Sequence, residues 1–344
     1  MLALQKVGKG VGNMEIRDVP EPSAQPGWLK IEVKAAAICG TDLHIRHDKF
    51  PYYPPVTLGH EFSGVIVELG EGVDDWELGE RVVAEPHSLA CGKCWLCRTG
   101  SPQICAEKRS PGWGIDGAFA KYLVMPAHLL HRLPDSVSFD AGALVEPTCN
   151  TVHDVLERAK VEPEDIVMVM GPGPIGLLAA QVAKAGGARE VMIVGTPGDA
   201  ELRLPLAEKL GIDHVVNLVE TDPAELCLEI TGGRGADLVV DCSGAEPAIN
   251  ACIGMVRKQG RMCVIGMTGK EDIRVTWDAA IFKAITVYFN ISTSYTSWDR
   301  SISMIEKGKI DVESLITHRV PLTDWEEVFD ALEEQQGVKG LLIP

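Results

Sequence analysis

The sequence predicts an α/β protein of two domains, a mostly β domain and a doubly wound parallel sheet, chiefly because of the order of its apolar segments. From about residue 164 onward, apolar segments with strand character alternate with segments of helical periodicity, which is the pattern of a parallel sheet with crossover helices. Before that point, short apolar segments are separated by Gly and Pro, as in strands joined by turns. A chain of 344 residues, 46% of them hydrophobic, is long enough for two separate cores.

The first third of the chain supplies the strands of the β domain. Residues 29–36 and 62–69 are rich in apolar side chains and are bounded by Gly and Pro, so we expect a strand in each. Residues 52–55 end in two prolines and predict a tight, stiff loop between these strands.

The rest of the chain supplies the parallel sheet and a closing segment. A helix is expected at residues 174–185, and strands at 166–170, 191–194, 238–241, 262–265 and 285–289. After residue 290 the pattern changes to a helix at 298–307, an extended segment at 317–321 and a helix at 325–334. A segment of this kind could return to the first domain.

A glycine-rich turn after the first strand of the sheet predicts a dinucleotide site. The turn reads Gly171-Pro-Gly173-Pro174-Ile175-Gly176, a G-x-G-x-x-G pattern in the strand, turn and helix context that makes such a match credible. The glycines permit a tight turn, close approach of a pyrophosphate and close packing of helix on strand. We therefore expect a Rossmann domain that binds NAD or NADP, rather than a glycine turn without a ligand.

The second strand of the sheet lacks the acidic residue that usually binds the ribose of NAD. It ends in Gly195-Thr196, and Asp199 lies beyond a proline and a glycine. Without that carboxylate there is no repulsion against a 2'-phosphate, which Thr196 and Arg203 could contact. Arg203 has a second interpretation, because it can simply begin a helix over 203–210. We expect NADP to be used at least as well as NAD.

Four cysteines at short spacing predict a structural zinc site. The pattern C-x2-C-x2-C-x7-C is formed by Cys91, Cys94, Cys97 and Cys105. Four thiolates can close around one tetrahedral zinc ion, and such a closed site holds a lobe together without doing chemistry.

A second group of metal-ligand residues leaves one coordination position open. Cys39, His60 and Glu61 offer a sulfur, a nitrogen and an oxygen, and a catalytic zinc needs such an open position. Taken alone, Cys39 would be a small buried hydrophobe, and Glu61 could orient His60 instead of touching the metal. The combination favours a second zinc site, so we expect two zinc ions per chain.

The charge and the cysteine content exclude several classes of protein. A formal net charge of −17 argues against nucleic acid or an anionic membrane as a partner, because both attract clustered Lys and Arg. No apolar stretch reaches the roughly 20 residues of a membrane span, and the first residues do not form a signal peptide. The other five cysteines lie in apolar segments, which indicates a reducing compartment and a cytoplasmic protein. They are Cys149, Cys227, Cys242, Cys252 and Cys263.

The residues around His60 and the order of the motifs resemble one known family. The pattern G-H-E-x2-G-x5-G-x2-V is matched position by position by Gly59, His60, Glu61, Gly64, Gly70 and Val73. Together with Cys39-Gly-Thr41-Asp42, the four-cysteine lobe and the glycine turn, it makes the chain similar to the zinc-dependent medium-chain dehydrogenases over nearly its whole length. The resemblance implies a GroES-like catalytic domain at 1–147 and 293–344, with a zinc lobe near 88–110, and a Rossmann domain at 148–292. It also implies a homo-oligomer, either a dimer or a tetramer.

Within that family, the chain resembles the polyol dehydrogenases most. Glu146-Pro147 is similar to the sorbitol and polyol dehydrogenases, whereas the segment from Ile316 to Arg319 is similar both to these and to threonine dehydrogenases. The segment from Ile291 to Trp298 matches neither group. Tyr295 and Trp298 in this region either line a substrate pocket or pack the lobe or a subunit interface.

The resemblance and the open metal site together imply reversible oxidation of a secondary alcohol, such as a polyol, to a ketone. Zinc would lower the pKa of the substrate hydroxyl, as it lowers that of bound water from about 15.7 to about 7, and hydride would pass to NAD(P). The family implies Glu146 as a further ligand, direct or through water; otherwise it is an acidic residue at a helix start. Thr41 could hydrogen-bond the substrate oxygen, or it could be a turn residue whose hydroxyl bonds only its own backbone. His44 could carry the proton away, with His47 and His87 as competitors.

Other functions remain in view for the same residues. The nearer alternatives are oxidation of L-threonine and reduction of a simple ketone by a secondary-alcohol dehydrogenase. An alternative of another class is a regulator that binds zinc and a dinucleotide without turnover, although the complete Cys39, His60 and Glu61 set counts against it.

Overall fold

The computed structural model describes all 344 residues, and the chain divides into two compact units. The first unit comprises Met1–Glu146, Ser292–Glu306 and Ile316–Pro344, and the second comprises Pro147–Ile291 and Lys307–Leu315. The short segment Lys307–Leu315 is tied to the second unit by Gln181, whose side chain donates to the backbone oxygen of Asp311 and accepts from its N–H.

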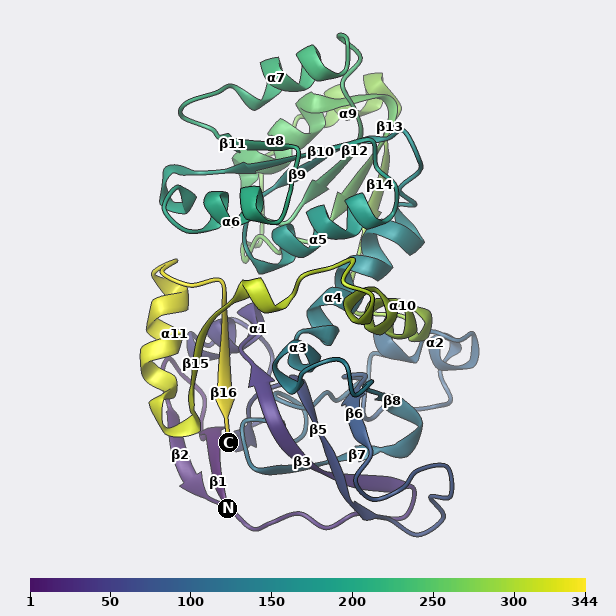
Figure 1. Cartoon of the computed structure of the whole chain (residues 1–344), viewed down its shortest axis with the longest axis vertical. Helices are drawn as coiled ribbons and strands as arrows, with labels where there is room; N and C mark the ends of the chain where they lie inside the picture. Colours follow the sequence, from purple (N-terminus) through teal and green to yellow (C-terminus); the bar gives the residue numbers. More distant parts are fainter. The chain divides into compact units, whose positions relative to one another are not determined.

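The second unit is built on a six-stranded parallel sheet with the strand order β11-β10-β9-β12-β13-β14. Its elements are η3 (a π-helix, Val152–Arg158), β9 (Ile166–Met170), α5 (Pro174–Ala185), β10 (Glu190–Gly195), η4 (Pro197–Asp199), α6 (Arg203–Lys209), β11 (His214–Asn217), α7 (Pro223–Ile230), β12 (Ala236–Asp241), α8 (Glu246–Met255), β13 (Val256–Val264), α9 (Trp277–Lys283), β14 (Thr286–Phe289) and η5 (Glu313–Leu315). In Figure 1, α5 and α6 lie on one side of the sheet and α8 and α9 on the other. Because both faces are covered, β9 and β12 are buried along their whole length. The predicted doubly wound sheet is confirmed.

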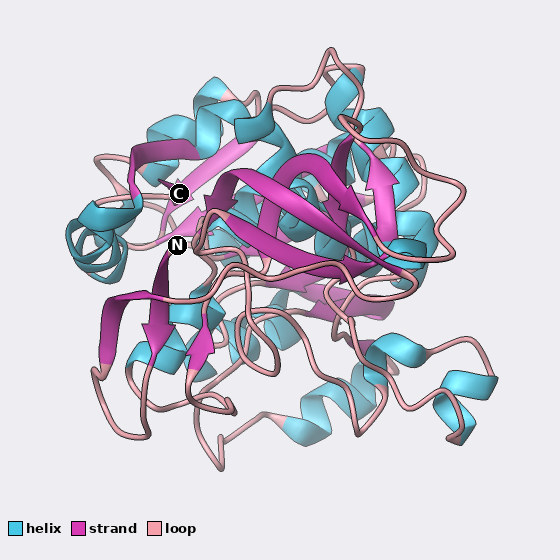
Figure 2. Ribbon diagram, turned by 90° about the horizontal axis from the view of Figure 1, so that it is seen from below, coloured by secondary structure: helices cyan, strands magenta, loops and turns pink.

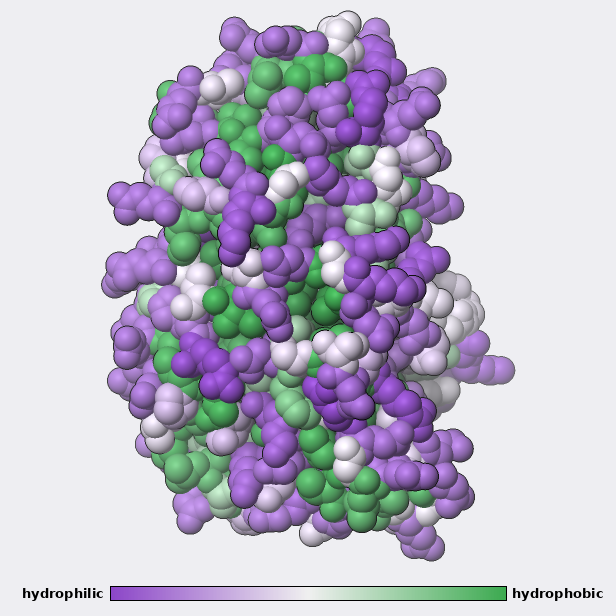
Figure 3. Space-filling view, in the orientation of Figure 1, coloured by the Kyte–Doolittle hydropathy of each residue, from purple (hydrophilic) through white to green (hydrophobic).

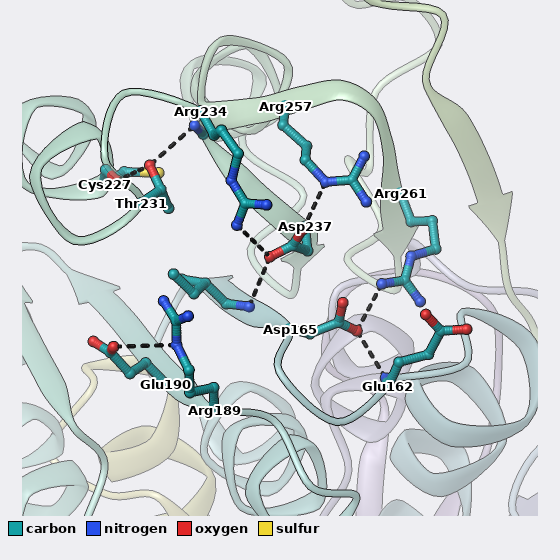
Figure 4. A network of polar contacts seen from close by, with 12 residues as sticks. Glu162, Asp165, Arg189, Glu190, Cys227, Thr231, Arg234, Asp237, Arg257 and Arg261 are labelled. Carbon is teal, nitrogen blue, oxygen red and sulfur yellow. Dashed lines mark hydrogen bonds and ion pairs between the residues drawn. The ribbon is translucent and has the colours of Figure 1, made fainter.

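Two acidic side chains at the amino ends of the central strands tie these strands to β13. Asp237 accepts hydrogen bonds from the backbone N–H of Ile166 at 3.0 Å and from Arg257 Nε at 2.6 Å. Asp165, just before β9, forms an ion pair with Arg261 at 2.6 Å (Figure 4). Both carboxylates are nearly buried, so the paired arginines offset the cost of removing them from water. This network fixes the end of the sheet opposite the glycine turn.

The first unit is mostly β, as predicted. Its elements are β1 (Leu2–Lys6), β2 (Met14–Asp18), β3 (Trp28–Ala37), α1 (Gly40–Arg46), β4 (Val56–Thr57), β5 (Glu61–Leu69), β6 (Arg81–Ala84), α2 (Trp95–Arg98), η1 (Pro102–Ile104), β7 (Tyr122–Pro126), η2 (Ala127–Leu129), β8 (Leu130–Arg132), α3 (Phe139–Ala143), α4 (Val145–Thr151, which crosses the boundary), α10 (Tyr295–Glu306), β15 (Ile316–Pro321), η6 (Leu322–Asp324), α11 (Trp325–Glu333) and β16 (Lys339–Ile343). The larger sheet has the path β15-β16-β3-β5-β6-β8 with β7 beside β3, and a three-stranded sheet has the order β2-β1-β4. Figure 2, seen from below, shows that the strands in the foreground are strongly curved.

The C-terminal elements join the core of the first unit through main-chain pairing. β16 runs antiparallel to β3, with Leu341 opposite Ala37, and β15 lies parallel to β16. Helix α11 contacts both strands and buries Val328 and Phe329 in the same hydrophobic cluster as the side chains of β3 and β5. The last strand is therefore an inner strand of the sheet, next to the residues that carry the metal-ligand motifs.

None of the helices is both long and apolar enough to cross a membrane. The face of the protein in Figure 3 is mostly hydrophilic, with hydrophobic residues in separate patches. Scattered apolar residues are normal on a protein surface and do not by themselves mark an interface.

Candidate active site and metal centres

The strand register of the first unit brings three distant segments together at one end of the sheet. Ala37 of β3 lies opposite Glu61 of β5 on one side and opposite Leu341 of β16 on the other. Cys39 follows two residues later as the N-cap of α1, and Lys339 is the first residue of β16. Pairing of three strands thus makes neighbours of Glu61 and Lys339, which are 278 residues apart in the chain.

Cys39, His60 and Glu61 form one cluster of potential metal ligands. One ligand atom from each lies within 4.8 Å of the others, and the side chains of His60 and Glu61 are buried. Nδ1 of His60 has no hydrogen-bond partner, which is costly for a buried polar atom unless a ligand engages the ring. A thiolate, an imidazole and a carboxylate are ligand types of zinc, so the residues present fit the metal that the sequence predicts.

Asp42 is a further member of this site that the motif analysis did not assign a role. It is fully buried in the first turn of α1 and accepts a hydrogen bond from the backbone N–H of Cys39 at 2.9 Å. It therefore fixes the segment that carries Cys39. Burial raises the pKa of Asp42, while the nearby His60 opposes that shift. The available signal was the acid three residues after the cysteine, at a helix start.

The charges of the site favour a bound cation. Burial by itself would lower the pKa of His60, but Cys39, Asp42 and Glu146 raise it to about 10. Anionic groups that hold a proton on a buried imidazole above neutral pH provide the same attraction for a divalent metal, which would bind in place of that proton.

Lys339 is the second charged member of the site that sequence reasoning missed. Its buried ammonium forms an ion pair with Glu61 and donates a hydrogen bond to the backbone oxygen of Ile38 at 3.0 Å. Burial by itself would lower the pKa of Lys339, but the nearby Glu61 raises it above its ordinary value, so the lysine keeps its charge. The available signal was a lysine beside an apolar segment, because a buried strand rarely carries an unpaired charge.

The three residues predicted to act beside the metal lie on two helices. Thr41 and His44 are on α1, which Cys39 caps, and Glu146 is in the first turn of α4. Glu146 is buried and influences the pKa of His60, but it is not part of the tight group of ligand atoms.

The three candidate histidines differ in their surroundings. Burial lowers the pKa of His44, and Lys49 and His47 lower it further. His47 bonds to Glu333 at 2.9 Å, on α11. His87 is not a surface residue, since only 7% of it is exposed. His44 is therefore a half-buried imidazole that stays neutral at neutral pH, as a proton acceptor must.

The four cysteines of the lobe are arranged for one tetrahedral ion. Their sulfur atoms lie 3.5 to 3.9 Å apart in four of the six pairs and within 4.8 Å in all of them, and zinc–sulfur bonds of about 2.3 Å give tetrahedral edges of about 3.8 Å. Backbone N–H groups of Lys93 and Cys94 lower the pKa of Cys91, whereas burial and the neighbouring thiols raise that of Cys97. Four sulfurs at this spacing cannot all ionise without a cation, so the lobe fits a structural zinc.

The glycine turn of the second unit has the geometry of a phosphate-binding loop. Gly173 is the N-cap of α5, and a Cβ atom there would meet nothing within 4 Å, so the space before the helix N-terminus is open. Pro174 and Ile175 form the first turn of the helix. A Cβ at Gly176 would lie 1.8 Å from the backbone oxygen of Gly171, so only glycine permits this close packing.

The end of β10 is less open to a 2'-phosphate than the sequence suggests. Thr196, directly after Gly195, donates hydrogen bonds from its N–H and its hydroxyl to Asp199 at 2.9 and 2.8 Å. Arg203 begins α6 and pairs with the same carboxylate at 3.2 Å. Thr196 and Arg203 are thus joined to each other through Asp199, which partly neutralises the charge of Arg203.

The two aromatic residues near the start of α10 have different positions. Trp298 is buried, donates to Thr293 Oγ1 at 3.0 Å and stacks on His131, so it packs the first unit. Tyr295 is exposed and borders a cavity of about 320 Å³. None of the predicted metal ligands lines this cavity.

Comparisons with known proteins agree with this site. Residues 25–135 match the family model of the alcohol dehydrogenase GroES-like domain, and residues 174–307 match that of the zinc-binding dehydrogenases.

Three curated relatives cover nearly the whole chain. A sorbitol dehydrogenase of Halalkalibacterium halodurans is 38% identical, over 100% of this chain and 99% of the relative. A D-arabitol-phosphate dehydrogenase of Enterococcus avium is 35% identical, over 99% and 97%. An L-threonine 3-dehydrogenase of Bacillus licheniformis is also 35% identical, over 99% and 98%.

Two solved structures with bound cofactor are similar over their whole length. A protein of Sinorhizobium meliloti 1021 bound to NADP has a TM-score of 0.92 and 29% identity, over 100% of this chain and 99% of that one. An alcohol dehydrogenase of Escherichia coli CFT073 complexed with NADH has a TM-score of 0.87 and 28% identity, over 100% and 99%.

Proposed function

The chain belongs to the zinc-dependent alcohol dehydrogenases, and from this premise we propose that it oxidises a secondary hydroxyl of a polyol to a ketone, reversibly, with transfer of hydride to NAD or NADP. The observation that carries the proposal is the cluster of Cys39, His60 and Glu61, three ligand types within 4.8 Å. The resemblance of Glu146-Pro147 to the polyol dehydrogenases supports the choice of a polyol, as do the sorbitol and arabitol-phosphate dehydrogenases among the relatives.

We assign the two clusters different roles. Cys91, Cys94, Cys97 and Cys105 hold a structural zinc, and Cys39, His60 and Glu61 hold a catalytic zinc with Glu146 as a fourth ligand, direct or through water. The catalytic zinc supplies a Lewis acid that makes the substrate hydroxyl more acidic. Lys339 holds Glu61 in place by an ion pair from the side of β16, and Asp42 holds the backbone of Cys39.

Two residues of α1 are proposed to handle the hydroxyl proton. Thr41 and His44 are three residues apart, so they lie on one face of the helix. The Thr41 hydroxyl would hold the substrate oxygen, and His44 would pass the hydroxyl proton on to solvent; a bound oxidised nicotinamide would supply the hydride acceptor. The lowered pKa of His44 supports this role, because the imidazole is neutral and able to accept.

A panel of alcohols tests the proposed function. Sorbitol and D-arabitol should give reduced nicotinamide with higher kcat/KM than L-threonine and than a simple secondary alcohol such as 2-butanol. A preference for L-threonine would favour the threonine dehydrogenase relatives instead. Absence of hydride transfer from every alcohol, with zinc and cofactor bound, would favour a regulator without turnover.

For the cofactor, we propose that NADP is used at least as well as NAD. The absence of a carboxylate at Gly195 and Thr196 supports this, because no charge there repels a 2'-phosphate. The ion pair of Arg203 with Asp199 limits the preference, since the guanidinium is partly neutralised. A kcat/KM for NADP far below that for NAD would overturn the proposal.

We also propose that the chain forms a homo-oligomer through β14. This strand pairs with β13 only, so its other edge has unpaired backbone groups. Exposed apolar side chains surround this edge, among them Val287 and Phe289 on the strand and Ile281 and Phe282 on α9. Pairing of two copies across the edge would cover these groups.

A further inference from the structure

A partly buried lysine of the first unit, Lys108, has no ion-pair or hydrogen-bond partner of its own. Lys108 lies in the segment that leads from the four-cysteine lobe back to the first sheet, and burial lowers its pKa. Its ammonium forms no ion pair or hydrogen bond; its contact is the face of Trp113, 5.9 Å from the ring centroid. Lys339, in contrast, is bonded to Glu61. A partly buried ammonium without a bonded anion is available to an anionic ligand.

The segment that follows Lys108 is packed against Gly59, the residue before the proposed zinc ligand His60. A Cβ atom at Gly117 would lie 2.1 Å from the backbone oxygen of Gly59, the residue before His60. Gly112 is similarly close to Gly59, and the N–H of Ala118 donates to its oxygen at 2.9 Å. Charges also connect the two regions, because Glu146 affects the pKa of both Lys108 and His60.

A second nitrogen without a partner lies next to Lys108. Leu89 and Arg109 form a backbone bridge with hydrogen bonds of 3.1 and 2.8 Å, which holds the segments of His87 and Lys108 side by side. Nδ1 of His87 is buried without a hydrogen bond, and Glu85 is 3.7 Å away, beyond hydrogen-bond distance. Arg109 is not available, because it covers Tyr53 and donates to backbone oxygens.

We infer that Lys108, with His87 as a second donor, binds an anionic group carried by the substrate, and that this group is a phosphate ester on the polyol. The inference rests on the proposed function, since it names the class of polyol. A lysine gives a strong, charge-assisted hydrogen bond to phosphate. A similar relative acts on D-arabitol phosphate, which is consistent with this class. A carboxylate is the other anion that the same nitrogen atoms would hold, and L-threonine carries one.

Kinetics of Lys108→Met with matched substrates tests the inference. The wild type should oxidise D-arabitol phosphate with a kcat/KM at least about tenfold above that for D-arabitol, and Lys108→Met should abolish the difference through KM. Lys108→Arg should retain most of it. Lys307→Met, which removes an exposed lysine elsewhere, should behave as the wild type. Equal loss with both substrates, or no preference in the wild type, would overturn the inference and leave the proposed function standing. If Lys108→Met lowered the kcat/KM for L-threonine alone, the anion bound by Lys108 would be a carboxylate, and the proposal of a phosphate ester would be wrong.

Binding of inorganic phosphate gives a readout that does not need turnover. Calorimetric titration should show phosphate binding to the wild type and at least about tenfold weaker binding to Lys108→Met, at equal zinc content. If no sugar alcohol is oxidised at all, the proposed function fails, and this titration still decides the role of Lys108. Equal affinity in both proteins would contradict that role.

Discussion

Among single residues, the proposed metal site depends most on the buried ion pair between Lys339 and Glu61. Both side chains are almost completely buried, and each compensates the charge of the other. A buried ion pair is weak evidence for stability as such, but removal of one partner leaves an uncompensated charge in the core. The ion pair therefore offsets the desolvation cost of the buried Glu61 carboxylate, whether or not a metal is bound.

Lys339→Met should lower the free energy of unfolding by about 3 to 5 kcal/mol, because it leaves the Glu61 carboxylate without its partner. Urea denaturation of the protein without zinc at the Cys39 site, but with zinc in the four-cysteine lobe, measures this. The double variant with Glu61→Gln should recover much of the loss, since it removes the stranded charge as well. A loss below about 1 kcal/mol in the single variant would show that Glu61 has another partner or is protonated.

At the same scale, the pH dependence of turnover tests His44. Its pKa is lowered from the ordinary value of 6.5, so the imidazole is a neutral acceptor above that pH and becomes protonated only in more acidic solution. The rate of alcohol oxidation should therefore fall on the acid side, below pH 6.5, as His44 gains a proton. His44→Gln should reduce kcat and remove this acid limb, whereas His47→Gln should keep it. An acid limb that is unchanged in His44→Gln would assign the proton transfer to another group.

Helices and strands could be predicted from the sequence wherever the residues that determine them are close together in the chain. The expected strand at 166–170 and helix at 174–185 coincide with β9 and α5, because apolar runs and the Gly-Pro turn act within a few residues. The same holds for the four-cysteine lobe, whose ligands are close in the chain.

Features that depend on tertiary pairing could not be predicted. Lys339 meets Glu61 only because β16 pairs with β3, and Asp199 joins Thr196 to Arg203 only through the turn after β10. The short strand β11, His214–Asn217, was missed because it has too few apolar residues to stand out. His87, which the sequence offers as a competitor of His44, is buried by the fold.

The lobe should hold its zinc more tightly than the cluster around Cys39. Four thiolates enclose a metal completely, whereas the other site has an exchangeable position. Mild chelation should release one zinc per chain with loss of activity and an unchanged circular dichroism spectrum, and the second zinc only under conditions that unfold the lobe. Simultaneous release of both ions with unfolding would contradict the assignment.

The turn after β10 should set the choice of cofactor. Gly195 is a poor site for a test, because a Cβ there would lie 2.8 Å from Leu204 and Pro172 side-chain atoms. Thr196 is exposed, and Asp and Asn can both accept hydrogen bonds from the N–H groups of the following turn in its place, but only Asn can still donate to Asp199. Thr196→Asp should shift the ratio of kcat/KM values toward NAD by at least tenfold relative to Thr196→Asn, about 1.4 kcal/mol. Equal ratios in the two variants would place recognition of the ribose elsewhere.

At the scale of the whole molecule, the exposed edge of β14 predicts an assembled protein. Sedimentation of the wild type at micromolar concentration should show a dimer or a tetramer. A charge at Phe282 or Val287, as in Phe282→Glu with Val287→Lys, should dissociate the contact across β14, since it would bury charges at the centre of the interface. Leu78→Glu, at an exposed apolar residue of the first unit, should leave the assembly intact. A monomeric wild type would remove the proposed interface.

The most direct test of the proposed dehydrogenase function follows a labelled hydrogen from the substrate to the cofactor. A polyol deuterated at its secondary carbinol carbons is incubated with zinc-loaded protein and NAD or NADP, and the reduced nicotinamide is examined by mass spectrometry. The wild type should transfer deuterium to the nicotinamide, whereas Cys39→Ser should bind the cofactor with unchanged affinity, retain one zinc per chain and transfer none. Full transfer by Cys39→Ser, or no transfer from any secondary alcohol by the wild type, would contradict the account.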